Sequence, residues 1–93
     1  MTDTDHELLE LAYRAWAPGL NYIRLINDAG RDYWNPLEDN GDAFRLAVKL
    51  RMIVTPGTAR LLDGRLFGKD KDSVEETRRA IVMAAAYIGR TMQ

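Results

Sequence analysis

The chain has 93 residues, of which 46% are hydrophobic and 29% charged, and it contains no cysteine. This composition predicts a single small domain spanning 1–93, and no apolar run approaches the roughly 18 residues that a membrane span requires. The absence of cysteine excludes disulfides and thiolate chemistry, and the formal net charge of −1 lacks the basic excess of dedicated nucleic-acid binders. Because the polar, acidic N-terminus does not resemble a secretory signal, we expect a cytoplasmic protein.

The first predicted helix covers about residues 4–17. Thr4 and Glu7 have the spacing of a capping box, in which each side chain bonds the other residue's backbone N–H. Apolar residues then recur at helical spacing, and Pro18-Gly19 ends the helix. The expected apolar face consists of Leu8, Leu9, Leu11, Ala12, Ala15 and Trp16.

Two short extended segments are predicted to follow as a hairpin. Residues 20–26 are rich in β-branched and aromatic side chains, and 31–34 form the returning strand. Between them, Asn, Asp and Gly at 27–30 favour a tight turn. Asn35-Pro36 ends the second strand because proline has no backbone N–H to donate to a sheet.

A central helix is predicted over 42–51. Glu38, Asp39 and Asp42 lie where carboxylates interact favourably with the dipole of a helix N-terminus. The apolar residues of this helix occupy so wide an arc that the pattern predicts a helix pressed deeply into the core. They are Ala43, Phe44, Leu46, Ala47, Val48 and Leu50.

A strand at 52–55, ended by Pro56-Gly57, and a second hairpin are predicted next. The strands of that hairpin, 58–62 and 65–67, flank Asp63-Gly64. This dipeptide is typical of a two-residue type I′ turn.

The last and longest helix is predicted from Ser73 to about Met92. Ser73 and Glu76 form a second capping box. The stripe expected to face the core consists of Val74, Ile81, Ala85, Ile88 and Met92. Helices interleaved with hairpins predict the α+β class, in the order α-ββ-α-β(β)-α. We expect a small antiparallel sheet, of two short hairpins or three to four strands, packed with three helices.

The catalytic and metal-binding motifs that we compared with the sequence are incomplete. His6 begins a pattern like the helical zinc motif, but a glutamate replaces the second histidine. Residues 64–70 are one residue short of a phosphate-binding loop, and 38–42 lack the alternating oxygen ligands of a calcium loop. Ser73 is accounted for by its capping box. We therefore expect no catalytic residue, no cofactor and no metal.

Tyr33, Trp34 and Asn35 are the first candidate binding residues, because aromatic side chains beside a loop can anchor an interface. The interpretation we favour for Trp34 is structural. In so small a domain its ring is expected to fold into the core, over Phe44 and Val48.

Basic side chains of the second hairpin and the last helix are the second candidate. Arg60, Arg65, Arg78 and Arg79, together with Lys69, could contact phosphates. The interpretation we favour is a solvated face whose charge is balanced by Asp70, Asp72, Glu75 and Glu76.

Two segments resemble a family of small proteins encoded by tailed bacteriophages and prophages, the phage ABA-sandwich domain. They are 34–50, beginning Trp-Asn-Pro-Leu, and 76–90, which contains Thr-Arg-Arg-Ala-Ile-Val. The first helix, with His-Glu-Leu-Leu-Glu-Leu-Ala at 6–12, is similar too, whereas the likeness weakens over 53–72 and in the first hairpin. The resemblance implies a sheet flanked by helices, a phage or prophage origin and action in the cytoplasm of the bacterial host. It implies no catalytic residues.

These observations leave three functional hypotheses. The first is a phage accessory protein without enzymatic activity, a small module that binds an unidentified host or phage protein, as a monomer or weak homodimer. The second is a weak nucleic-acid-associated protein that uses the basic side chains; we do not expect tight, sequence-specific binding. The third is an enzyme of unrecognised type, for which the sequence supplies neither a nucleophile nor a metal site.

Overall fold

The computed structural model describes residues 3–17, 34–69 and 71–92 of the chain. In these ranges the helices are α1 (Asp3–Trp16), α3 (Asn40–Lys49) and α4 (Val74–Thr91), and the strands are β1 (Ile53–Thr55), β2 (Thr58–Arg60) and β3 (Leu66–Gly68). The strands form an antiparallel sheet in the order β1-β2-β3. The predicted α+β class with three helices is therefore confirmed. The predicted first hairpin lies outside the described residues except for Trp34, which is at a bend and not in a strand.

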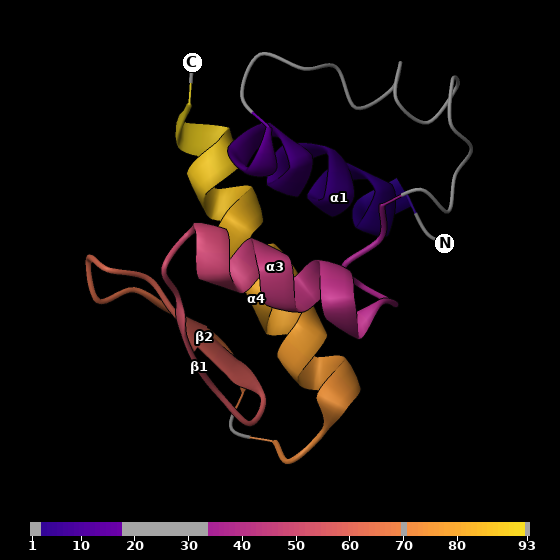
Figure 1. The fold of residues 1–93 in the computed structure, drawn as a ribbon. Coiled ribbons are helices and arrows are strands. Elements are labelled where there is room, and N and C mark those ends of the chain that lie inside the picture. Colours follow the sequence, from indigo (N-terminus) through magenta and orange to yellow (C-terminus); the bar gives the residue numbers. More distant parts are fainter. Residues whose placement is uncertain (1–2, 18–33, 70, 93) are drawn as a thin grey trace.

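Helix α4 is the centre of the domain. It contacts α1, α3 and all three strands, and Figure 1 shows it running through the middle, with α1 across its C-terminal half and α3 crossing in front of it. Its residues from 80 to 86 are buried except for Met83. The helix is therefore buried on several sides, whereas the sequence predicted a single buried stripe. Val74, which belongs to the predicted stripe, is 61% exposed. A helix surrounded by other elements must be apolar on more than one face.

Small residues allow α1 and α4 to approach closely. Ala12, Ala15 and Ala85 are buried, and a Cβ added to Gly89 would lie 1.8 Å from the carbonyl oxygen of Leu11. The backbones of α1 and α4 are therefore in direct contact at Gly89. Glycine is required there because any side chain would overlap the facing helix.

The turn before α3 is held by side-chain hydrogen bonds to the backbone. Asn35 Oδ1 accepts from Leu37 N at 3.1 Å, and Asn35 N donates to Asp42 Oδ2 at 2.9 Å. Asp39 is the N-cap of α3 and accepts from Asp42 N at 2.7 Å. The helix thus begins two residues before the predicted 42–51, and the expected role of these carboxylates at its N-terminus is confirmed.

Two tight turns join the strands. Pro56 and Gly57 occupy the centre of the first turn, and Gly57 has φ +81°, as the second central residue of a type II turn does. In the second turn Leu61 N bonds to Arg65 O at 2.8 Å and Gly64 has φ +94°, while Asp63 does not have a positive φ. The predicted type I′ turn is therefore wrong. The loop has three residues with glycine in the left-handed position, a common alternative for hairpins.

Candidate functional site: an apolar groove beside α3

An apolar groove lies between α3, β1 and α4. Its volume is about 310 Å³. The lining residues are Asn40, Ala43, Phe44, Ala47, Val48, Met52, Val54, Arg78 and Ile81. We call this surface the α3 groove.

The groove exists because α3 buries only part of its apolar arc. Ala43, Leu46 and Ala47 are buried against the core, whereas Phe44 is 68% exposed and Val48 is 60% exposed. Phe44 and Val48 are one helical turn apart and therefore share a face of the helix. The prediction that this whole helix is pressed deeply into the core is wrong, since the arc is wider than the surface that covers it. Exposed apolar side chains that adjoin one another mark a binding surface more often than scattered ones do.

Arg78 and Asn40 form the polar part of the groove. Arg78 Nε donates to the carbonyl oxygen of Leu37 at 2.8 Å, and its Nη1 donates to Asn40 Oδ1 at 2.7 Å. These two bonds fix the guanidinium against the turn that precedes α3. Arg78 therefore joins α4 to the start of α3 and gives this end of the apolar lining a fixed polar edge.

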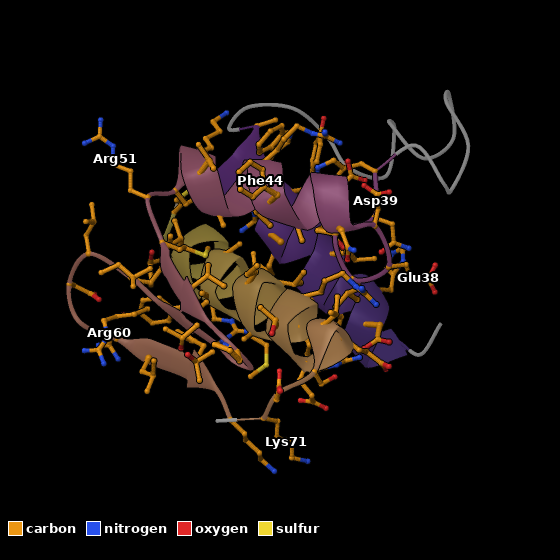
Figure 2. The ribbon with its side chains drawn as sticks, turned by 60° about the horizontal axis from the view of Figure 1, so that its bottom comes forward. Glu38, Asp39, Phe44, Arg51, Arg60 and Lys71 are labelled. Carbon is orange, nitrogen blue, oxygen red and sulfur yellow. The ribbon has the colours of Figure 1, made fainter. Side chains whose placement is uncertain are left out.

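The two ends of α3 carry opposite charges. Glu38 and Asp39 are exposed at its N-terminal end, which we call the acidic end. Arg45 lies beside it, with Nη2 3.9 Å from Asp39 Oδ2 and 2.7 Å from Asp42 Oδ1. Arg51 is exposed just beyond its C-terminus, and Arg60 is exposed on β2 opposite Ile53; these form the basic end. Figure 2 shows Phe44 between the two ends, with Glu38 and Asp39 on one side and Arg51 and Arg60 on the other.

Arg51 adopts the left-handed conformation that ends α3, with φ +56°. Met52 N bonds to Ala47 O at 2.9 Å and Arg51 N bonds to Val48 O at 3.2 Å, which is the pattern of a Schellman motif. Glycine is the usual residue at this position, and an L-residue with a side chain costs about 1–2 kcal/mol there. The basic end therefore carries its charge at a strained position.

Trp34 is a core residue and does not line the α3 groove. It is 5% exposed; its ring packs edge-on against Tyr13 at a centroid distance of 5.2 Å and lies 6.3 Å from Trp16. The structural interpretation of Trp34 is confirmed, but its predicted neighbours are wrong, because it packs on α1 and not over Phe44 and Val48. Asn35 serves the turn before α3, and Tyr33 lies outside the described residues.

The candidate basic residues contact different parts of the fold. Arg65 lies over the ring of Tyr87 at 4.6 Å, and Arg79 Nη2 is 3.0 Å from Asp5 Oδ1. Arg78 is bonded to the turn before α3, as described above, and Arg60 is exposed on β2. Lys69 and Arg79 line a common hollow of about 300 Å³, which also contains Glu76. Arg79 also lines a hollow with Glu75, so its surroundings include two of the acids that the sequence named, in addition to Asp5 on α1.

No cluster of three or more His, Cys, Asp or Glu side chains able to hold a metal ion occurs within residues 3–17, 34–69 and 71–92. In the same ranges, no helix is long and apolar enough to cross a membrane. Comparisons with protein-family models, with curated proteins and with solved structures find no match for this chain.

The sequence contained the signal for the groove but not its location. Six apolar residues in the predicted helix over 42–51 indicate a broad apolar surface. Which part of that surface is covered depends on the position of α4 and the sheet. Phe44 and Val48 were therefore expected in the core, and the α3 groove was not predicted.

Proposed function

We propose that the protein is a protein-binding module without enzymatic activity and that the α3 groove is its binding surface. The observation that carries this proposal is the exposure of Phe44 and Val48 beside a hollow lined by apolar side chains. Burying such side chains against a partner removes apolar surface from water, which favours association by about 25 cal/mol per Å². A large apolar side chain in a pocket is also the usual centre of a protein interface.

The proposed biological setting comes from the sequence. The resemblance of 34–50 and 76–90 to phage ABA-sandwich proteins supports a phage or prophage accessory protein that acts in the bacterial cytoplasm. The partner is then a protein of the host or of the phage. A contact based on an apolar groove with charged ends requires neither a cofactor nor a metal.

Site-specific photocrosslinking tests this function. A photoreactive benzoylphenylalanine replaces Phe44 in one variant and Leu62 in the other, and both are expressed at low level in infected or lysogenic bacteria. Leu62 is the matched control because it is 76% exposed and lies in the β2–β3 loop rather than in the α3 groove. We expect a crosslinked partner from position 44 and not from position 62.

The crosslinked partner is then purified and titrated with the unmodified protein and with the variants Val48→Asp and Leu62→Asp. Val48→Asp places a carboxylate in the groove and should weaken binding by at least about 30-fold, as expected when a central interface residue is lost. Leu62→Asp adds the same charge elsewhere and should bind like the unmodified protein. Equal crosslinking at both positions, or equal affinities of the two aspartate variants, would contradict the proposed surface.

A further inference from the structure

We propose that the α3 groove binds a second copy of this chain, with the two α3 helices antiparallel about a two-fold axis. This inference rests on the proposed function, because it assigns a partner to the same surface. What carries it is self-complementarity: an apolar centre lies between an acidic end and a basic end. A second copy and a different protein chain then compete for the groove.

The positions of the side chains meet the requirement of a two-fold contact. In such a contact the apolar centre must lie on the axis, and opposite charges must lie at equal distances from it. The midpoint of Phe44 and Val48 is position 46, and the midpoint of Glu38 and Arg51 lies between 44 and 45. Both midpoints fall in the middle of α3, Asn40–Lys49.

Antiparallel packing joins opposite charges twice. Glu38 of each copy lies over Arg51 of the other, whereas Asp39 is paired with Arg45 of its own chain at 3.9 Å. The dipoles of the two helices oppose one another, which is favourable. A parallel pair would bring carboxylates against carboxylates and guanidinium against guanidinium. Complementary charges at the rim of an apolar contact fix its orientation more than they increase its affinity.

The backbone of Arg51 makes it possible to separate the effect of this side chain on association from its effect on folding. Glycine would end α3 at lower cost, yet the residue with φ +56° carries a charged, exposed side chain. Strain of this kind accumulates at functional sites. In the antiparallel pair this side chain is the one that faces the partner's acidic end.

The expected dimer is weak. Two phenylalanines, two valines and their neighbours would bury on the order of 800 Å², less than the roughly 1,200–2,000 Å² of stable interfaces. The hollow beside Phe44 is lined by the small side chains of Ala43 and Ala47, which leaves room for an apolar side chain of the second copy. We expect a dissociation constant on the order of 100 µM.

Analytical ultracentrifugation of charge-swapped variants tests the geometry. At about 50 mM salt, where exposed charges are weakly screened, the unmodified protein should pass from monomer to dimer between about 5 µM and about 1 mM. Glu38→Arg and Arg51→Glu should each weaken the dimer by about fivefold or more, because two attractive contacts become repulsive. The double variant should restore the affinity to within about twofold, since both contacts are again attractive.

Three further variants separate association from folding. Val48→Asp should abolish the dimer, whereas Leu62→Asp, exposed outside the groove, should leave it unchanged. Arg51→Gly should raise the melting temperature of the dilute monomer by relieving the strained backbone, and it should weaken the dimer at the same time. A change in stability alone cannot produce these opposite effects.

The results distinguish this inference from the proposed function. A protein that stays monomeric at about 1 mM and low salt, or a dimer that Val48→Asp does not affect, overturns the inference. A double variant as weak as the single ones overturns the antiparallel arrangement. If the dimer fails but crosslinking from position 44 yields a partner that Val48→Asp no longer binds, the proposed function stands alone. If the protein dimerises but crosslinking yields no other partner, the dimer inference stands and binding to a different protein is not supported.

Discussion

Gly89→Ala tests the close crossing of α1 and α4 on which the fold depends. In the exposed interior of a helix this change stabilises a protein by up to about 1 kcal/mol, because alanine has the higher helix propensity. Here the added Cβ would lie 1.8 Å from Leu11 O, whereas real Cβ contacts below 3.0 Å essentially never occur. The two helices must therefore separate by at least about 1.2 Å.

That separation determines the sign of the effect. Overpacking of this kind costs about 1–3 kcal/mol, and the helices also lose dispersion contacts along the crossing. After subtraction of the propensity gain, we expect Gly89→Ala to lower the free energy of unfolding by about 1 kcal/mol. For a domain of this size the melting temperature should fall by roughly 4–8 °C.

Gly41→Ala is the matched control. Gly41 also lies in a helix, but the atoms nearest to a Cβ there belong to side chains, the capping Oδ2 of Asp39 and the guanidinium of Arg45, at 3.1–3.3 Å. Because a side chain adjusts more easily than a facing helix backbone, we expect this variant to change stability by less than about 1 kcal/mol in either direction. Thermal and urea unfolding followed by circular dichroism measure both. If Gly89→Ala stabilises the protein, the backbones of α1 and α4 do not meet at Gly89.

Two further predictions concern the core. In a Trp16→Phe background, the fluorescence of Trp34 should have its maximum at short wavelength and resist quenching by acrylamide. Trp34→Ala should lower the free energy of unfolding by about 3–5 kcal/mol. Red-shifted, readily quenched emission would place the ring outside the core. Val82→Ala should lower the free energy of unfolding in urea by about 2 kcal/mol because Val82 is fully buried. Val74→Ala, at an exposed position of the same helix, should change it by less than about 0.5 kcal/mol. Equal costs for the two valines would contradict the central position of α4.

The sequence by itself determined the local features of this protein. Ser73 caps α4 by accepting from Glu76 N at 3.3 Å, as its spacing predicted, and Asp39 caps α3. Helix extents and the presence of a glycine turn at Gly64 could also be read from short windows. Such features follow from the sequence because the hydrogen bonds and dihedral angles involved belong to residues within a few positions of one another.

Only the tertiary structure decided which apolar surface is buried. Phe44 and Leu46 are similar in hydropathy and lie on one short helix, yet one is exposed in the α3 groove and the other is fully buried. The partner of Arg79 on α1 and the need for Gly89 against Leu11 likewise involve residues more than 70 positions apart. Periodicity shows that a helix has an apolar arc, but burial requires a second surface, and the position of that surface is set by long-range packing. For the same reason the binding surface proposed here appears only when α3, β1 and α4 are brought together.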